Sequence, residues 1–239
     1  MRIAVVSDIH GNLTALEAVL ADLREISPDL ILHGGDLAHG GSDAAGVVDR
    51  IRDLAWDGVL GNTDEMLFQP AALHDFATTS SAPPSLFVAI EEMAVATGAV
   101  LGEERLAWMR TLPRVRTHPP IALLHASPAS TWRAPAPEAG DAKLTSVYSP
   151  LGQPIAVYGH IHRSYIRNMA DLTVVNTGSV SLSYDGDPRS AYLLLDDGKP
   201  VIRRVEYDVE AEIKALSARG LPHHHWMAKT LRAAQPQMP

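Results

Sequence analysis

Residues 2–12 read RIAVVSDIHGN, and this segment decides the fold. Ile3 to Val6 form a short apolar run, rich in β-branched side chains, that stops at turn residues, as is typical of a strand buried on both faces. Asp8 and His10 follow two positions apart, and both are common metal ligands. In an extended segment residues i and i+2 point the same way, so we expect both side chains to bind one ion at the carboxyl end of the strand. A helix-capping Asp and a turn His would give the same short pattern, so the interpretation depends on the rest of the chain.

The first third of the chain repeats a strand, a polar loop and a helix. Apolar spacing predicts, in order, a helix over 13–26, a strand over 30–32, a helix over 44–56 and a strand over 59–60. Asp36 and Asn62 lie in the loops just after these two strands. Alternation of this kind implies right-handed crossovers and a parallel sheet in an α/β fold.

Residues 66–117 interrupt the alternation. They contain no clear strand, but 86–97 and 103–112 have helical patterns, so we expect a helical insertion or cap over 66–117. Strands resume over 121–124, 155–158 and 172–175, followed by an antiparallel hairpin of 191–195 and 201–205 and by a helix over 209–219. The last segment, about 220–239, is predicted to be a loosely held tail, with His223 to His225 on a surface loop.

Length and composition limit the possible functions. The 239 residues suggest one domain over 1–239 that includes the insertion, and 46% hydrophobic with 20% charged residues is ordinary for a globular protein. The net charge of -8 and the lack of a basic stripe argue against stable nucleic-acid binding. The absence of cysteine excludes disulfides and thiolate metal sites. The first residues lack a signal-peptide layout and no apolar run is long enough to span a bilayer, so we expect a cytoplasmic protein with no membrane partner.

Polar side chains gather after five predicted strands. They are Asp8 and His10, Asp36, Asn62, His125, and His160 with His162. This set offers only oxygen and nitrogen, which suits Mn²⁺, Fe²⁺, Zn²⁺ or Ni²⁺. A single histidine is more often a hydrogen-bonded core or surface residue, but seven such residues that all follow buried strands point to one shared cause. The sequence therefore predicts a metal site at the strand ends.

The same residues fall into blocks that resemble those of the calcineurin-like metallophosphoesterases, in their compact prokaryotic branch. The blocks of that family run Asp-x-His, Gly-Asp, Gly-Asn-x-[Asp/Glu], a lone His and Gly-His-x-His. They occur here in that order as Asp8-Ile9-His10, Gly35-Asp36, Gly61-Asn62-Thr63-Asp64, His125 and Gly159-His160-Ile161-His162. The resemblance covers about residues 1–205 and implies the family's fold, a four-layer α/β/β/α sandwich of two mixed sheets.

The resemblance also implies a dinuclear metal site that hydrolyses phosphoester bonds, in phosphodiesters or activated phosphomonoesters. Asp8, His10 and His162 would hold the first divalent ion, Asn62, His125 and His160 the second, and Asp36 would bridge both. A hydroxide shared by the two ions would be the nucleophile, and Mn²⁺ is the ion that we expect to support activity. The expected partner is a small phosphorylated substrate, and the oligomeric state stays open.

One position departs from the family pattern. Many relatives carry a His after the Asn of the third block, placed to protonate the leaving alkoxide, and here that position is Thr63. A hydroxyl does not donate usefully at neutral pH, so we expect a preference for good leaving groups. His39, in the loop after Asp36, is a candidate catalytic residue as a substitute acid. The alternative is that His39 faces solvent.

Two other functions stay open from the sequence. The first is a non-catalytic metal-binding interaction scaffold on the same fold, which the missing acid favours and the full set of seven ligands opposes. The second is hydrolysis of dinucleoside polyphosphates, which some relatives cleave. A metal-dependent assay over phosphomonoesters, diesters and nucleotides separates the three functions.

Overall fold

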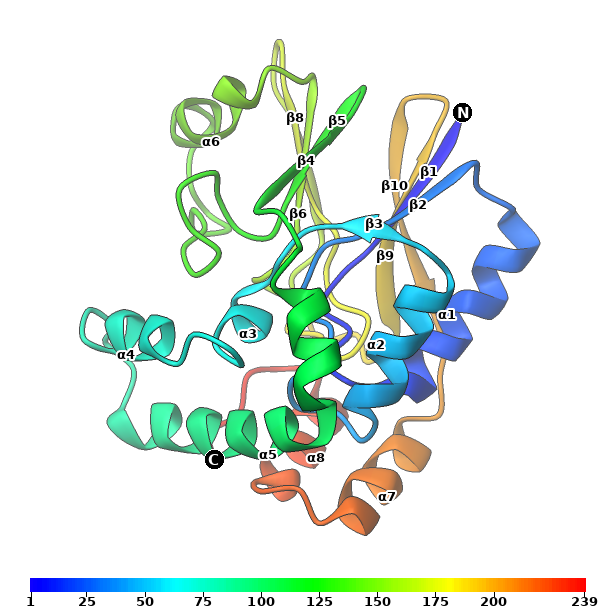
Figure 1. Ribbon diagram of the computed structural model, residues 1–239. Coiled ribbons are helices and arrows are strands. Elements are labelled where there is room, and N and C mark those ends of the chain that lie inside the picture. The colour runs from blue at the N-terminus through cyan, green and yellow to red at the C-terminus, as the bar shows by residue number, and fades with distance from the viewer.

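Two mixed five-stranded sheets pack face to face at the centre of the protein, in a computed structural model that describes residues 1–239 (Figure 1). The first sheet has the order β10-β9-β1-β2-β3, with β1 (Arg2–Val6), β2 (Leu30–His33), β3 (Asp57–Gly58), β9 (Ser190–Asp196) and β10 (Lys199–Val205). The second has the order β4-β5-β6-β8-β7, with β4 (Val115–His118), β5 (Ile121–Leu124), β6 (Ile155–Tyr158), β7 (Tyr165–Asn168) and β8 (Thr173–Asn176).

Strand β1 lies in the middle of the first sheet, as its apolar sequence predicts. It runs parallel to β2, with Ile3 opposite Leu30, and antiparallel to β9. Because side chains alternate along a strand, Ile3 and Val5 point into the space between the sheets, where they join a cluster that includes Ile121 and Val157. The other face of β1 packs against helices. Burial of both faces therefore fixes β1 in the inner layers.

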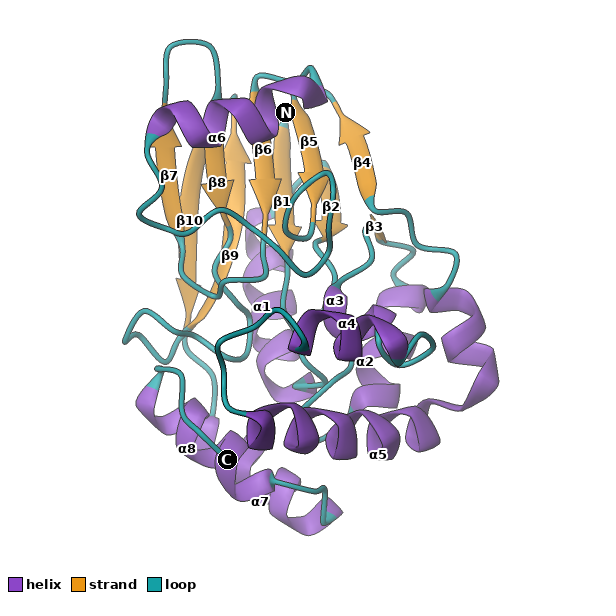
Figure 2. Cartoon of the chain, turned by 90° about the vertical axis from the view of Figure 1, so that its left-hand side faces the viewer, coloured by secondary structure: helices purple, strands orange, loops and turns teal.

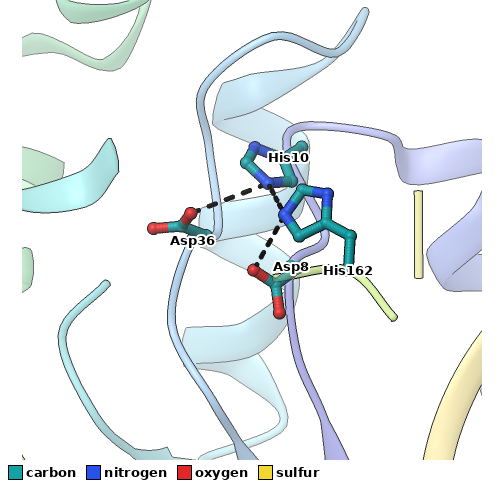
Figure 3. A group of neighbouring side chains, drawn as sticks. All are labelled: Asp8, His10, Asp36 and His162. Atoms are coloured by element: carbon teal, nitrogen blue, oxygen red, sulfur yellow. Dashed lines mark hydrogen bonds and ion pairs between the residues drawn. The ribbon is translucent and has the colours of Figure 1, made fainter. Parts of the chain in front are cut away.

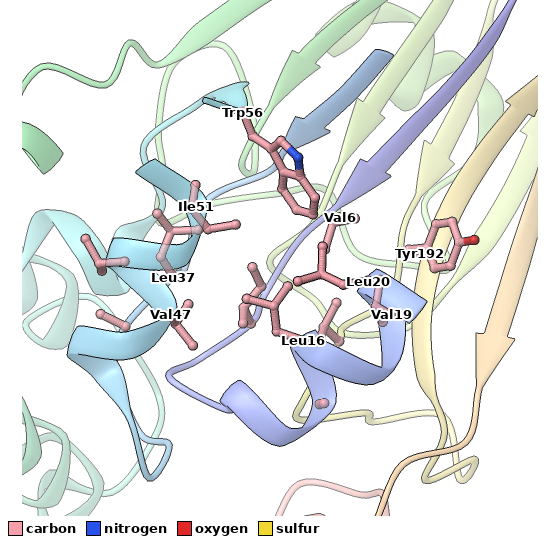
Figure 4. Packing of buried hydrophobic residues seen from close by; sticks show 14 of the residues in the cluster. Val6, Leu16, Val19, Leu20, Leu37, Val47, Ile51, Trp56 and Tyr192 are labelled. Carbon is pink, nitrogen blue, oxygen red and sulfur yellow. The ribbon is translucent and has the colours of Figure 1, made fainter. Parts of the chain in front are cut away.

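Helices cover the outer face of each sheet. On the first sheet, α1 (Leu13–Ile26) and α2 (Ala44–Asp53) pack Leu16, Val19 and Val47 against Val6 of β1 (Figure 4). On the second sheet, α6 (Asp141–Tyr148), followed by the short 3₁₀ helix η1 (Ser149–Leu151), contributes Leu144 and Tyr148 to a cluster with β5, β6 and β8. The predicted four-layer α/β/β/α sandwich of two mixed sheets is confirmed.

The helical insertion is shorter than the predicted range of 66–117. It contains α4 (Ala71–Ala77) and α5 (Pro84–Met109), after the one-turn helix α3 (Asn62–Glu65). The predicted end of the insertion at residue 117 was wrong, because residues 115–118 form the edge strand β4, which pairs antiparallel with β5. Strand β4 has the sequence VRTH, with a single apolar residue, and is only half-buried, so it carries no clear apolar pattern.

By length and composition, helix α5 is long and apolar enough to cross a membrane. The expectation that no apolar run is long enough to span a bilayer was therefore wrong. The helix contains an 18-residue window of mean hydropathy 1.5. In this fold Met93, Leu101 and Met109 of the helix are buried in the domain. The φ of 68° at Gly102 interrupts the helix, so its two predicted parts meet at a kink.

The prediction of a loose tail over 220–239 was wrong. After α7 (Val209–Arg219), which forms as predicted, the chain makes a further helix, α8 (His224–Ala233). Met227 and Leu231 of α8 are buried against Leu216 of α7 and Met93 of α5. The histidine run is the start of α8 and not a loop. The apolar stripe of α8 is as periodic as that of α1, but it is short, follows three histidines and lies in a terminal segment, where loose structure is the usual expectation.

Four smaller elements also differ from the predictions. Strand β3 covers residues 57–58 and not 59–60, helix α2 ends at residue 53 and not 56, and the strand of residues 165–168 was missed. Helix α6 forms inside a stretch that its alanine, proline and glycine content made resemble a loop. These are short or edge elements, in which packing outweighs local sequence preference.

Candidate metal centre

The seven predicted ligands lie on five loops at one end of the two sheets. Helices α4, α5, α7 and α8 gather at the same end (Figure 2). The ligands follow β1 (Asp8 and His10), β2 (Asp36), β3 (Asn62, the first residue of α3), β5 (His125) and β6 (His160 and His162). All are buried except His160, which is partly exposed. The carboxyl ends of parallel strands from both sheets therefore meet at one site, as the open α/β arrangement requires.

Four of these side chains form a first donor group, shown in Figure 3. One ligand atom from each of Asp8, His10, Asp36 and His162 lies within 4.8 Å of the others. His162 Nε2 is 3.1 Å from Asp8 Oδ1 and also 3.1 Å from His10 Nε2. These atoms can converge on one ion.

The other three side chains form a second donor group beside the first. Asn62 Oδ1 is 2.9 Å from both His125 Nε2 and His160 Nδ1. Asp36 Oδ2 connects the two groups, because it is 3.6 Å from His10 Nε2 and 3.4 Å from His125 Nε2. The structure therefore brings all seven predicted residues together in one continuous cluster.

Three of the imidazoles have their tautomer fixed by the backbone. The Nδ1 atoms of His10, His125 and His162 donate to the carbonyl oxygens of His39, Gly34 and Leu182 at 2.9, 2.8 and 2.7 Å. A carbonyl only accepts, so each neutral ring keeps its proton on Nδ1 and presents an Nε2 lone pair to the site. His10 Nε2 and His162 Nε2, 3.1 Å apart, would then repel each other unless a cation lies between them. The donor set therefore fits a metal ion.

The two carboxylates are held in place by hydrogen bonds. Thr63 N–H donates to Asp36 Oδ1 at 2.9 Å, so that Asp36 Oδ2 faces the imidazoles. Ser7 Oγ donates to Asp8 Oδ2 at 2.7 Å. Asp64, which fills the fourth position of the third block, accepts from the backbone amides of Asp36 and Leu37, both at 2.8 Å. The motif position of Asp64 was visible in the sequence, but its clamping of the Asp36 loop was not.

The electrostatics of the cluster favour a positive charge at its centre. Burial acts to raise the pKa of Asp36, but the facing imidazoles of His125 and His10 outweigh it and hold that pKa well below its usual range. Burial acts to lower the pKa of His125, but the carboxylates of Asp36 and Asp8 outweigh it and raise the pKa to about 10. Without an ion, the cluster therefore holds a proton on His125. A bound cation would supply that charge and displace the proton.

The ligand loops are held in an unusual backbone conformation. Five of the seven predicted ligands have a positive φ: Asp8 (57°), His10 (51°), Asp36 (54°), His160 (68°) and His162 (55°). A left-handed residue other than glycine costs about 1–2 kcal/mol, and such strain is typical of functional sites. The expectation that Asp8 and His10 meet because their segment is extended was wrong in its reason. They meet because both are left-handed in a turn.

Two motif glycines lie against the carboxylates. A Cβ atom on Gly61 would be 2.1 Å from Asp36 Oδ1, and one on Gly159 would be 2.2 Å from Asp8 Oδ2. No side chain fits at either position. The glycines of the third and fifth blocks are therefore needed because the ligand carboxylates pack directly on their backbone.

A cavity of about 170 Å³ opens over the donor groups. Besides the ligands His10, Asp36, Asn62, His160 and His162, its walls are formed by His39, Thr63, Met66, Ile90, Trp132, Leu182, Tyr184, Trp226 and Met227. Thr63 Oγ1 is buried there without a hydrogen-bond partner. None of the apolar and aromatic wall residues was predicted, because single side chains from separate helices and loops share no sequence signal.

His39 is buried, so the alternative of a solvent-facing loop histidine was wrong. It lines the cavity, with Nε2 3.3 Å from the carbonyl oxygen of Ile90. Burial, together with the nearby His10, lowers the pKa of His39 to about 4. Its imidazole is therefore neutral at pH 7. Its own carbonyl oxygen accepts from His10, which gives the residue a second contact with the site.

Comparison with known proteins identifies the family of this chain. The model of the calcineurin-like phosphoesterase superfamily domain matches residues 1–198. The chain belongs to the calcineurin-like phosphoesterase superfamily. The chain is 27% identical, over 96% of its own length and 96% of the other, to an uncharacterized protein of Methanocaldococcus jannaschii.

Solved structures share the fold of this chain. A metallophosphoesterase from Sphaerobacter thermophilus has a TM-score of 0.77 and 23% identity, covering 98% of this chain and 99% of the other. A hypothetical protein from Pyrococcus horikoshii has a TM-score of 0.83 and 18% identity, covering 99% of both. The family and the buried Asp/His group together support metal-dependent phosphoester hydrolysis.

Proposed function

We propose that this phosphoesterase uses two divalent ions to hydrolyse small phosphodiesters or activated phosphomonoesters. The position of Asp36 Oδ2 between the two donor groups is the observation that carries this proposal. This oxygen is 3.6 Å from His10 Nε2 in one group and 3.4 Å from His125 Nε2 in the other. A carboxylate that faces two sets of donors at once is the residue type that can join two ions.

The ligands divide between the two ions by proximity. Asp8, His10 and His162 would hold the first ion, Asn62, His125 and His160 the second, and Asp36 would contact both. Mixed oxygen and imidazole donors suit Mn²⁺, Fe²⁺, Zn²⁺ or Ni²⁺, and we propose Mn²⁺ as the ion that supports activity. Asn62 brings an uncharged oxygen, so the second ion keeps more of its positive charge for the phosphate.

The protein's own residues would orient the reaction. When bound, a pair of divalent ions activates water and neutralises charge on the phosphate oxygens. The Thr63 amide fixes Asp36, and the carbonyl groups of His39, Gly34 and Leu182 fix the rings of three ligands. Ligands held in this way need little rearrangement during the reaction, which is the main source of electrostatic catalysis.

The site offers few groups that can donate a proton to the leaving group. Thr63 replaces the histidine of many relatives, and His39 is the only other cavity residue outside the ligands with a titratable ring nitrogen. We propose His39 as the candidate acid because it is buried beside the donors, although a pKa of about 4 leaves few protonated rings at pH 7. The substrates that suit this site have leaving groups that depart without a proton.

The contribution of His39 can be measured with esters of different leaving groups. If it delivers a proton, His39→Ala slows hydrolysis of an alkyl ester by about 10²-fold or more and of an aryl ester much less. Equal losses on both esters would instead make His39 a residue that positions His10. Unchanged rates on both esters would remove His39 from the mechanism.

Metal stoichiometry tests the proposed function directly. We expect elemental analysis of protein incubated with Mn²⁺ and then desalted to give two ions per chain, and Asp36→Asn to lower this number and abolish hydrolysis of an aryl phosphodiester. Asp53→Asn, on the exposed end of α2, is the matched control. One ion per wild-type chain would refute the dinuclear arrangement. Two ions per chain without hydrolysis of any phosphoester would favour the alternative function, a non-catalytic metal-binding interaction scaffold.

A further inference from the structure

The cavity over the metal ligands has two chemically different sides. One side is formed by the carboxylate, amide and imidazole donors. The apolar part of the lining, which we call the apolar wall, is formed by Ile90, Leu182, Tyr184, Trp226 and Met227, of which Tyr184 lies beside the ligand His162 with 4.6 Å between ring centres. A diester whose phosphate reaches the donors can place one of its ester groups against this wall, if the proposed function is correct.

Much of the apolar wall comes from segments added to the core fold. Ile90 lies on α5 of the insertion, and Trp226 and Met227 lie on α8, beyond residue 198, where the match to the family model ends. The two helices are joined, because His223 Nε2 is 2.6 Å from Glu92 Oε2 and Met227 shares a buried cluster with Met93. The part of the wall on α5 and α8 is therefore held by contacts between two helices that contain no metal ligand.

The apolar wall carries no positive charge. No lysine or arginine lines the cavity. Arg114 and Arg133 line a neighbouring cavity, but Arg114 pairs with Glu65 at 2.9 Å and the Arg133 guanidinium lies 5.1 Å from the centre of the Phe76 ring. A polyphosphate chain extending from the donors would place unpaired negative charge against apolar side chains, which is unfavourable. This argues against dinucleoside polyphosphates as substrates.

We propose that the apolar wall selects phosphodiesters in which the ester group that does not leave is large and apolar or aromatic. Such a diester carries a single negative charge, which ions held by the donor side would neutralise, and its organic group buries apolar area against Trp226 and Met227. The indole of Trp226 is held in place, since its Nε1 donates to the carbonyl oxygen of Gln237 at 2.8 Å. A fixed aromatic ring favours stacking on a planar group.

Two esters that differ only in the group facing the wall test this proposal. Methyl 4-nitrophenyl phosphate and phenyl 4-nitrophenyl phosphate have the same leaving group and the same charge. With Mn²⁺-loaded protein we expect kcat/KM to favour the phenyl ester by about tenfold or more, as burial of an aromatic group predicts. Trp226→Ala should bring the ratio close to one, and Trp226→Phe should keep most of it.

Controls separate loss of the wall from damage to the helix. Lys229→Ala changes an exposed residue of the same helix and should leave the ratio unchanged. Met227→Gln keeps the length of the side chain while removing its apolar end, so it should lower the ratio as Trp226→Ala does. Equal kcat/KM values for the two esters in the wild-type protein would overturn the proposal.

Equilibrium binding gives a second readout that does not depend on turnover. We expect calorimetry to show tighter binding of diphenyl phosphate than of dimethyl phosphate, by about tenfold, and Trp226→Ala to abolish the difference. If neither ester is hydrolysed but diphenyl phosphate is preferred, the proposed function fails and the apolar wall stands. If both esters are hydrolysed but diphenyl phosphate is not preferred, the proposed function is supported and selection by the apolar wall is refuted.

Discussion

His33, on β2, is a buried histidine outside the metal centre whose effect on stability can be measured. The side chain has no exposed surface, and neither ring nitrogen has a hydrogen-bond partner. Trp108 lies nearby, with 6.3 Å between ring centres. Burial, opposed by Asp57 and assisted by Arg116, lowers the pKa of His33 from 6.5 to about 4. Protonation of this ring in the folded protein is therefore strongly disfavoured.

The depressed pKa makes folding sensitive to acid in a defined window. Above pH 6.5 the ring is neutral in the folded and unfolded chains, so it adds no pH dependence. Between pH 6.5 and 4 the unfolded chain binds a proton that the folded chain does not, and the free energy of unfolding falls as pH falls. A pKa difference of this size corresponds to about 3 kcal/mol lost across the window, since one pH unit is worth about 1.4 kcal/mol.

Substitution of His33 by leucine removes this effect while keeping a side chain of similar volume. We expect urea unfolding of His33→Leu and wild type, measured from pH 7.5 to 4.5, to diverge by about 2–3 kcal/mol, with the variant losing less stability in acid. Both proteins share the same metal ligands, so loss of metal in acid cancels in the difference. His74→Gln, at an exposed position, controls for removal of a surface imidazole. Stability curves that stay parallel over this range would refute the reasoning.

Three further outcomes follow from the metal centre. Removal of metal by a chelator should abolish phosphoester hydrolysis and lower Tm, and Mn²⁺ should restore both, as activity assays and thermal melts would show. Gly61→Ala should lower unfolding free energy by about 1–3 kcal/mol and weaken metal binding, because its Cβ overlaps Asp36, whereas Gly140→Ala, with nothing within 4 Å, should do neither. At pH 7, where few His39 rings carry a proton, wild-type rates should fall steeply as the pKa of the leaving group rises, and a flat dependence over a series of aryl and alkyl esters would show that a protonated acid is present at that pH.

The inner layers of the fold and the metal ligands could be predicted because their physical causes are local in sequence. Ile3 to Val6 is apolar without interruption, and only a strand with both faces covered buries every one of those side chains. In a sheet of this type the loop after such a strand lies at the functional edge. The ligand types in those loops then indicated a metal site before their distances were known.

The outer layer and the cavity walls could not be predicted, because their causes are long-range. No pattern in the sequence around Trp226 and Met227 indicates that α8 packs against α5. The contact depends on Met93 and on His223, which are distant from each other along the chain. His39 illustrates the same limit, since its burial is set by Ile90, fifty-one positions away, and not by its own loop. Such placements follow from packing of whole helices.

The metal centre shows why a motif can be right while the local reasoning behind it is wrong. Asp8 and His10 converge through left-handed residues, a strained conformation that no isolated loop would keep. The strain is held by a layer of contacts behind the ligands: Ser179 Oγ donates to the Asp8 carbonyl oxygen at 2.9 Å, and Asp64 clamps the Asp36 amide at 2.8 Å. The positions of the metal ligands are therefore set by hydrogen bonds between loops. Loss of Asp64, which is no ligand in this arrangement, should consequently weaken metal binding much as loss of a ligand does.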